Sequence, residues 1–259
     1  MYIILSVGYL YKCLKFKMNI SIMIGRAGSK GFPNKNITKI FGKRLCEYPL
    51  IASKESNVIK KNYVSTNCKV IKKVSKKLGA ILIDRPHKLT SDKALGDHVF
   101  EDAYFKIKEL EKDKIDFIVL LFANAPLVTP KMIKKGISLL KNNPKADSAV
   151  SVSRYNMWSP LRARKVSKDG SLVPFVPFKT FGDPKTLNCD RDSQGDVWFA
   201  DMSLSIVRPR CLENLSKGLL PQKWMGKKIL PIYSEGAFDV DYEWQIPSVK
   251  YWIKKKNEE

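Results

Sequence analysis

Residues 22–37 read IMIGRAGSKGFPNKNI, and this stretch decides the fold of the chain. Its first residues belong to a short apolar run, Ile20–Ile24, which is typical of a buried strand. The strand leads directly into a loop that contains Gly25, Gly28 and Gly31. Glycine permits positive φ and a close approach of the backbone to a ligand, and successive N–H groups in such a turn form a concave anion site. The stretch therefore predicts an anion-binding loop at the carboxyl end of a core strand.

Three cations are interleaved with these glycines, namely Arg26, Lys30 and Lys35, and they supply full positive charge for phosphate oxygens. The loop is not a Walker A motif, because Lys30 is followed by Gly31 and no Ser or Thr follows a Gly-Lys pair. It is not a Rossmann fingerprint, because the glycines fall at G-x-x-G-x-x-G and Pro33 soon interrupts. The pattern favours a polyphosphate nucleotide as ligand. The alternative is a flexible surface turn whose cations are simply solvated.

Strand-like apolar runs alternate with helical patterns along the chain, which predicts an α/β fold with βαβ units and a mainly parallel sheet. Helices are expected at about Glu47–Ser56, Lys69–Leu78, Gly96–Glu111 and Pro130–Asn142, and from about Tyr242 onward. Further strands are expected at Asn62–Ser65, Ala80–Ile83, Asp116–Phe122, Ser148–Ser153, Ser203–Val207 and Lys228–Ile232, and just before Asp239.

The periodicity is lost between Arg154 and Ala200, where four prolines and several aromatic residues occur. This segment is long for an unstructured loop in a compact domain. We therefore expect one domain over residues 18–259 with an inserted element at about 154–200. Residues 1–17 are apolar with lysines at their end, too short to span a bilayer, and without a basic first region. Our hypothesis is that they are a dispensable extension or that Met18 is the natural start.

Composition limits the classes of function. The formal charge of the 259-residue chain is +22, which would suit a nucleic acid or an anionic membrane. The lysines, however, are spread over helical surfaces, and no recognition helix, RNA-binding signature or zinc finger is evident, so neither partner is expected. Five widely spaced cysteines without C-x-x-C argue against a disulfide framework or a zinc site and favour reduced thiols in the cytoplasm.

The glycine-rich loop resembles the signature of the cytidylyltransferases that activate nonulosonic acids, the CMP-sialic acid synthetase family. Their loop typically reads A-R-G-G-S-K-G-x-P-x-K-N. The chain departs from it with Gly25 in place of Ala and Ala27 in place of Gly. The matching positions are Arg26, Gly28, Ser29, Lys30, Gly31, Pro33, Lys35 and Asn36. The related CMP-Kdo synthetases lack the Ser-Lys-Gly and Lys-Asn elements and resemble the chain less.

The resemblance implies a Rossmann-like, GT-A-like fold of the nucleotide-diphospho-sugar transferases, with helices flanking a mainly parallel sheet. It also implies that the inserted element is an arm exchanged between the subunits of a homodimer. The implied partners are CTP and an acidic 2-keto sugar, and the implied products are a CMP-sugar and pyrophosphate. The anomeric hydroxyl would attack the α-phosphorus in line, so that catalysis is mainly positioning and charge stabilisation.

The resemblance also assigns roles to residues. Arg26 and Lys30 would hold the triphosphate and stabilise the departing pyrophosphate, and Lys35 would neutralise charge near the α-phosphate. Asn36 would contact the nucleoside, and Arg85, which begins an R-P-x-x-L-x-x-D-like loop, would contact the base or a phosphate. Asp92 in that loop fits a ligand contact or a turn that starts the next helix equally well. The other nucleotide-binding positions are Gly25, Ala27, Gly28 and Ser29.

Two aspartates, Asp239 and Asp241, follow an apolar stretch near the end of the chain. Alternation along a short strand would put both carboxylates on one face, where they repel unless a cation lies between them. Mg²⁺ prefers one or two carboxylates plus substrate phosphates. The alternative is that Asp241 caps the following helix. The resembling family ends its domain with a similar Asp-x-Asp that holds the metal, so Mg²⁺ is the expected cofactor.

Two segments depart from the family and leave the identity of the sugar open. The strand end that reads L-Q-P-T-S-P-L in the family reads LFANAPL here, from Leu121 to Leu127, and its Asn-Gly element aligns with Asp201-Met202. Because these positions face the acceptor sugar in members of the family, the resemblance implies that Asn124 and Asp201 bind the substrate. Rival functions are another sugar nucleotidyltransferase or glycosyltransferase of the same fold and, more distantly, a basic RNA- or membrane-binding protein without turnover.

Overall fold

The computed structural model describes residues 17–91, 93–190 and 195–258, and its centre is a seven-stranded sheet in the order β11-β7-β10-β6-β1-β4-β5. Neighbouring strands are parallel except for β10, which runs antiparallel to both β6 and β7. The prediction of a mainly parallel sheet is confirmed. The strands are β1 (Lys17–Ile24), β4 (Lys61–Ser65), β5 (Ile81–Ile83), β6 (Lys114–Phe122), β7 (Ser148–Arg154), β10 (Trp198–Val207) and β11 (Ile229–Ser234).

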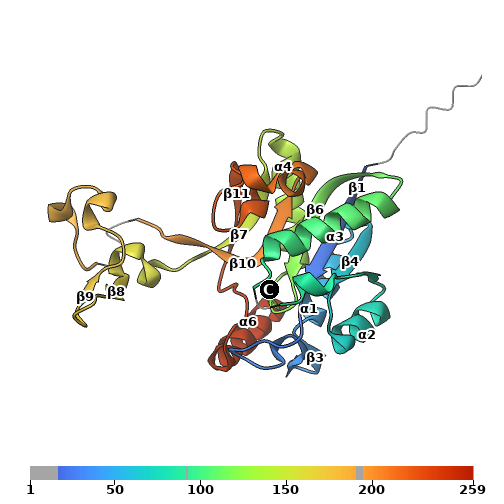
Figure 1. Cartoon of the computed structure of the whole chain (residues 1–259), viewed down its shortest axis with the longest axis horizontal. Helices are drawn as coiled ribbons and strands as arrows, with labels where there is room; N and C mark the ends of the chain where they lie inside the picture. Colours follow the sequence, from blue (N-terminus) through green and yellow to red (C-terminus); the bar gives the residue numbers. More distant parts are fainter. Residues whose placement is uncertain (1–16, 92, 191–194, 259) are drawn as a thin grey trace, which may run out of the picture.

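Helices cover both faces of this sheet, and α3 is seen lying across one of them in Figure 1. The helices α1, α2 and α4 pack on one face through side chains such as Leu50, Ile71 and Ile133. The opposite face is covered by α3 and α5, which contribute Phe100 and Leu212. The bounds are α1 (Glu47–Glu55), α2 (Lys69–Lys77), α3 (Gly96–Leu110), α4 (Pro130–Asn142), α5 (Pro209–Glu213) and α6 (Ile246–Glu258). The α/β fold predicted from the sequence is confirmed.

The first strand lies inside the sheet, between β4 and β6. Its Ile20 and Ile22 belong to the core on the α3 side, whereas Met23 belongs to the core on the opposite side, and all three are completely buried. Burial on both faces explains why this strand reads as a continuous apolar run.

The order of the strands reverses at β1. The chain adds β4 and β5 on one side of β1 and then crosses over to place β6 on its other side. In open α/β sheets such a reversal leaves a crevice outside the carboxyl ends of the strands, and ligands bind there. The glycine-rich loop begins at the carboxyl end of β1, directly at this reversal.

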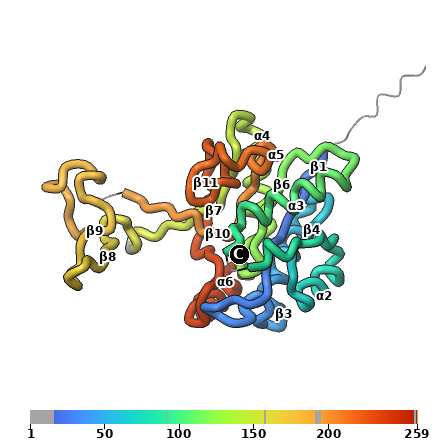
Figure 2. The backbone as a smooth tube through the Cα atoms, in the orientation of Figure 1, coloured from blue at the N-terminus to red at the C-terminus, as the bar shows by residue number. Residues whose placement is uncertain are grey.

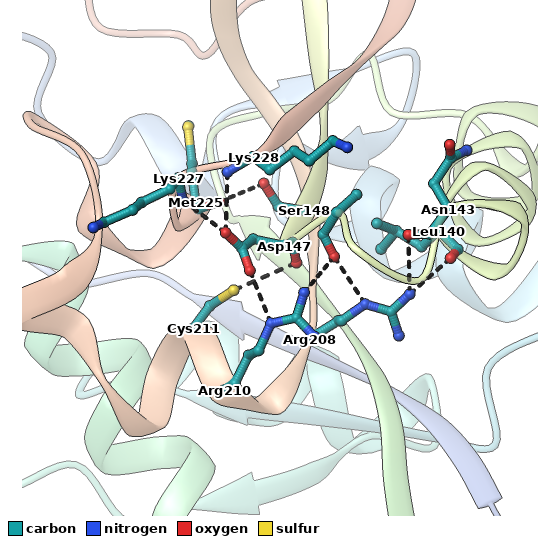
Figure 3. Close-up of polar contacts among 11 residues, drawn as sticks. Leu140, Asn143, Asp147, Ser148, Arg208, Arg210, Cys211, Met225, Lys227 and Lys228 are labelled. Atoms are coloured by element: carbon teal, nitrogen blue, oxygen red, sulfur yellow. Dashed lines mark hydrogen bonds and ion pairs between the residues drawn. The ribbon is translucent and has the colours of Figure 1, made fainter.

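Asp147, which directly precedes β7, is the centre of a polar cluster that Figure 3 shows. Asp147 accepts hydrogen bonds from Nε of Arg210 at 2.8 Å and from the backbone amides of Lys227 and Lys228 at 2.9 and 3.0 Å. Arg208 donates to the carbonyl oxygens of Ala146 and Leu140 at 2.9 and 2.7 Å. These contacts tie α4, α5 and the strand β11 to the start of β7.

The described residues between β7 and β10, 155–190 and 195–197, form an arm that projects away from the sheet, as Figures 1 and 2 show. The arm contains a small antiparallel pair, β8 (Arg164–Val166) and β9 (Leu172–Pro174). Its other described elements are short 3₁₀ helices, such as Asn156–Trp158 and Phe178–Phe181. The lost periodicity of the sequence therefore corresponds to a segment that does not pack on the main core.

The strand predicted just before Asp239 is wrong. The last strand, β11, ends at Ser234, and residues 237–241 have no strand structure. The amide of Val240 donates to the carbonyl oxygen of Asn124 at 2.8 Å instead of joining a strand ladder. Ala237 and Val240 are buried in a third, smaller core cluster with Val249 of α6. That helix begins at Ile246, after a 3₁₀ turn, rather than at Tyr242.

Two small strands, β2 (Lys39–Ile40) and β3 (Lys43–Arg44), pair beside this third cluster, to which Ile40 contributes. The expectations for residues 1–16 and for Asp92 lie outside the described residues. Among the helices that are described, none is both long and apolar enough to cross a membrane.

Candidate active site

A cavity of about 440 Å³ lies at the carboxyl ends of β1 and β6, where the strand order reverses. It is bounded by the glycine-rich loop, by the segment around Arg85, by the end of β6 and by the aspartate segment before α6. The predicted residues that line this cavity are Gly25, Arg26, Ser29, Lys30, Lys35, Asn36, Arg85, Asn124, Asp239 and Asp241. Tertiary structure thus brings together groups that are more than 200 positions apart in sequence.

The loop is held in place by close packing at its start. A Cβ atom on Gly25 would lie 2.5 Å from the Cβ of Ala123, so only glycine lets the loop approach the end of β6 this closely. Gly28 has a φ of 79°, which favours glycine for a second reason. Asn36 donates from Nδ2 to the carbonyl oxygen of Arg26 at 3.0 Å and braces the loop from inside.

Two predicted nucleotide-binding positions, Ala27 and Gly28, lie at an adjoining small hollow and not at the main cavity. The backbone amide of Ala27 donates to Oδ1 of Asn67 at 3.0 Å. Asn67 therefore orients the loop from the end of β4. Its only signal in the sequence is its place two residues after the predicted strand Asn62–Ser65.

Arg26, Lys30 and Arg85 bring positive charge to the cavity. Arg26 donates from Nη1 to the carbonyl oxygen of Gly28 at 2.8 Å, and Arg85 donates from Nε to the carbonyl oxygen of Leu89, also at 2.8 Å. Burial, followed by repulsion from Arg26, lowers the pKa of Arg85. Arg26, Arg85 and Lys30 line the same cavity, and this concentration of positive charge suits an anionic ligand.

The carboxylates of Asp239 and Asp241 also line the cavity. Burial, followed by repulsion from the carboxylate of Asp241, raises the pKa of Asp239 to about 6, although Lys35 and Asn124 act in the opposite direction. Lys35 forms an ion pair with Oδ1 of Asp241. Two carboxylates that repel each other beside one lysine form an oxygen donor set that suits a divalent cation. Within the described residues, no cluster of three or more potential metal-ligating side chains occurs.

The alternative role for Asp241 as a helix cap is wrong. The residue that caps the 3₁₀ turn before α6 is Tyr242, and Gln245 completes the cap. The backbone amides of Asp241 and Tyr242 both donate to Oε1 of Gln245, at 2.7 and 2.8 Å. These bonds fix the backbone of the aspartate segment and leave the carboxylate of Asp241 at the cavity.

The two expected substrate-binding residues differ in position. Asn124 lines the cavity directly after β6. Asp201 does not line it, because Asp201 is buried within β10 and its carboxylate accepts four hydrogen bonds. The donors are the hydroxyl groups of Ser151, Ser153 and Ser234 and the backbone amide of Ser203. The structure therefore does not bring Asp201 to the cavity. Its carboxylate instead joins β7, β10 and β11 at a buried junction.

Sequence reasoning missed part of the cavity wall. Phe122, one of the departures from the family, forms an apolar part of the cavity wall together with Val99 and Ala94. Tyr242 also lines the cavity, and a Cβ on Gly31 would lie 3.5 Å from its ring. Apolar side chains carry no chemical signature in a sequence, so their place at the cavity became visible only in the fold.

Comparison with solved structures places the fold among nucleotidyltransferases. CMP:2-keto-3-deoxy-manno-octonic acid synthetase in complex with CTP superposes with a TM-score of 0.64 at 12% identity, covering 92% of this chain and 99% of that one. A 4-diphosphocytidyl-2C-methyl-D-erythritol synthase from Anaerococcus prevotii gives a TM-score of 0.59, also at 12% identity and with the same coverage. At this level of identity the similarity shows that the chain shares the fold of these enzymes. The family model for cytidylyltransferases matches residues 20–168, more than half of the chain, and the chain belongs to this family.

Sequence relatives support this membership. Post-translational flagellin modification protein B of Campylobacter coli is 31% identical over 238 residues, which cover 90% of this chain and 93% of that protein. CMP-N,N'-diacetyllegionaminic acid synthase of Legionella pneumophila is 30% identical over 60% of this chain and 65% of that enzyme. N-acylneuraminate cytidylyltransferase of Oncorhynchus mykiss is 27% identical, and the aligned part spans 48% of its length.

Proposed function

We propose that this protein transfers CMP from CTP to a nonulosonic 2-keto sugar acid and releases pyrophosphate. The observation that carries the proposal is the cavity at the carboxyl ends of β1 and β6, which a basic glycine-rich loop and a pair of aspartates line together. Membership of the cytidylyltransferase family supports CTP as donor. The names of the relatives from Legionella pneumophila and Oncorhynchus mykiss support a nonulosonate as acceptor.

The residues of the cavity divide the work between them. Arg26 and Lys30 bind the phosphates and stabilise the charge of the departing pyrophosphate. Lys35 forms an ion pair with Asp241, and its positive charge neutralises negative charge near the α-phosphate. The anomeric hydroxyl loses its proton to solvent and attacks the α-phosphorus in line. The new oxygen–phosphorus bond forms as the bond between the α-phosphorus and the bridging oxygen breaks, and that oxygen leaves with pyrophosphate. Asn36 contacts the nucleoside part of CTP, and Arg85 contacts the base or a phosphate.

Mg²⁺ is the proposed cofactor, and Asp239 with Asp241 would hold it. These residues fit the ion, because they offer carboxylate oxygens at a position where burial and mutual repulsion disfavour two unpaired charges. When bound, Mg²⁺ neutralises phosphate charge and polarises the phosphoryl group. Two protein ligands suffice for this ion when substrate phosphates and water complete its coordination.

We also propose that the protein acts as a homodimer in the cytoplasm. The arm exposes four large apolar side chains, each more than 60% accessible, and a second copy of the chain would cover them. They are Trp158, Val166, Leu172 and Phe175. The four described cysteines are free thiols, as a reducing compartment requires.

The test is an assay of pyrophosphate release with Mg²⁺ and a panel of acceptors: sialic, legionaminic and pseudaminic acids, with Kdo as an eight-carbon control. We expect turnover with CTP and one nine-carbon acid, and none with UTP or GTP. Release from UTP or GTP in place of CTP would favour another sugar nucleotidyltransferase. Salt-sensitive RNA binding without thermal stabilisation by CTP would contradict the proposal altogether.

A further inference from the structure

We infer that Asn124 is a positioning residue that fixes the orientation of the Asp239 carboxylate, and that it does not act mainly by contacting the sugar. This inference rests on the proposed function, because it takes Asp239 as a ligand of Mg²⁺. It differs from the role expected from the sequence, in which Asn124 binds the acceptor directly.

Three hydrogen bonds carry the inference. Asn124 donates from Nδ2 to Oδ2 of Asp239 at 3.1 Å and to the carbonyl oxygen of Val240 at 2.9 Å. The amide of Val240 donates back to the carbonyl oxygen of Asn124 at 2.8 Å. Side chain and backbone of one residue therefore hold two successive residues of the aspartate segment.

The segment needs such a clamp because it has no strand ladder of its own. Residues 237–241 lie outside the sheet, whereas Asn124 lies two residues after the end of β6, a central strand whose Leu120 and Leu121 are completely buried. Asn124 itself is only 8% exposed. A rigid strand end thus supplies the fixed point from which Asp239 is oriented.

The chemistry of the amide suits this task. A primary amide carries two N–H protons, so Nδ2 can donate to Asp239 and to Val240 at the same time. Its bond to Oδ2 occupies one carboxylate oxygen and leaves Oδ1 for a cation. Groups that orient a metal ligand in this way typically change metal affinity or activity by about 10–100-fold when they are removed.

The position is also one at which this chain departs from the resembling family, whose strand end has Thr there. A threonine hydroxyl has a single proton and can donate to only one of the two oxygens. Asn124→Thr therefore removes half of the clamp, and Asn124→Ala removes both donated bonds. Comparison of wild type, Asn124→Thr and Asn124→Ala separates the effect of the lost hydrogen bonds from the effect of lost side-chain volume.

The experiment measures Mn²⁺ binding by electron paramagnetic resonance. Mn²⁺ is titrated into each variant together with a non-hydrolysable α,β-methylene analogue of CTP, with the nucleotide alone as reference. We expect Asn124→Ala to raise the Kd for Mn²⁺ by about 10–100-fold and Asn124→Thr to fall between Ala and wild type. Asn143→Ala is the matched control, because the exposed Asn143 donates from its amide to the carbonyl oxygen of Leu139 in α4 and does not line the cavity.

Kinetics supply the second readout. At saturating metal, Asn124→Ala should recover most of its kcat with an unchanged KM for the acceptor. A raised acceptor KM with unaltered Mn²⁺ affinity would overturn the inference in favour of direct substrate contact. If Asn124→Ala does not fold, as judged by its thermal midpoint, Asn124→Thr still decides the question.

Asp239→Asn distinguishes failure of the inference from failure of the proposed function. If Asp239→Asn weakens Mn²⁺ binding and the Asn124 variants do not, the clamp is overturned and the metal site stands. If Asp239→Asn leaves Mn²⁺ binding unchanged, the metal assignment fails and the clamp falls with it.

Discussion

Lys30 is the residue at which the proposed chemistry is most directly tested. It lines the cavity within the glycine-rich loop, and its charge is assigned to the phosphates of CTP. We expect Lys30→Ala to lower kcat/KM by at least about 100-fold, because one charged donor that stabilises transition-state charge is lost. The thermal midpoint should stay within a few degrees of wild type, since the loop lies at the surface.

Lys54→Ala provides the comparison, because Lys54 is an exposed lysine of α1 and has no place in the cavity. It should retain wild-type kinetics. Near wild-type turnover in Lys30→Ala would remove Lys30 from the mechanism.

Asp239 predicts a pH dependence of stability. Its pKa in the folded protein is raised to about 6 by burial and by Asp241, above the value of about 3.9 in an unfolded chain. The folded state therefore binds the proton more tightly, so this group's contribution to stability is complete below about pH 4 and is lost as the pH rises through about 6. We expect the metal-free wild type to lose a few degrees in thermal midpoint relative to Asp239→Asn between these pH values.

The measurement is a series of thermal melts in a chelator, from pH 4 to pH 8, for both proteins. A midpoint difference that is independent of pH would contradict the raised pKa. Adding Mg²⁺ with a non-hydrolysable CTP analogue at pH 7.5 should stabilise the wild type and leave Asp239→Asn nearly unaffected, because the ion favours the ionised carboxylate.

Single residues were predictable where their chemistry is visible in their type. Arg26, Lys30 and Lys35 stood out as cations between glycines, and the structure places all three on one cavity. The acidic side chain of Asp201 likewise led to the prediction that it belongs to the site. Its carboxylate is instead enclosed by hydroxyl and amide donors, and the sequence gives no sign that Ser153 or Ser234 lies beside it.

At the scale of elements, the approach of the loop to β6 is the critical packing. Gly25→Ala should destabilise the protein by about 1–3 kcal/mol, because the added methyl group would overlap the Cβ of Ala123 in an already filled space. The double variant Gly25→Ala/Ala123→Gly should recover much of that loss, since the main overlap is removed. Chemical denaturation of both single variants and the double variant measures the coupling.

Gly42→Ala is a suitable control for the glycine substitution. Gly42 has a φ of 80° but open space around its Cβ position, so it reports backbone strain without overlap. If the changes in the free energy of unfolding of Gly25→Ala and Ala123→Gly simply add up in the double variant, the two positions are not in steric contact.

Elements with strong local signals were predicted closely, and those that depend on distant contacts were not. The first four main helices begin at the predicted residues, because their amphipathic patterns and Pro130 at a first turn are local features. The segment before Asp239 was predicted as a strand because it is apolar. Its apolar residues are buried against α6 and Leu127 instead, and a sequence pattern cannot tell these two kinds of burial apart.

For the whole molecule, the arm predicts assembly with a second copy. Val166 and Leu172 face each other across the β8–β9 pair and are both 69% exposed. We expect the double variant Val166→Glu/Leu172→Glu to shift the protein from dimer to monomer, because buried unpaired charges would oppose association. Light scattering coupled to size-exclusion chromatography, repeated over a range of concentrations, measures the change.

Lys165→Glu changes charge on the same small hairpin at an exposed position and serves as the control. A wild-type protein that is monomeric at all accessible concentrations would contradict the dimer directly. The double variant should keep its thermal midpoint nearly unchanged, since the arm does not pack on the main core.

The sequence by itself determined the fold class, the basic loop and the aspartate pair, because apolar periodicity, glycine spacing and charge are local properties of the chain. Only the tertiary structure decided which of these groups share a cavity. The reversal of strand order at β1 brings Lys35 to Asp241, and the packing of the segment before α6 brings Asp239 to Asn124. Contacts over such separations depend on how the elements pack, and no local pattern records them.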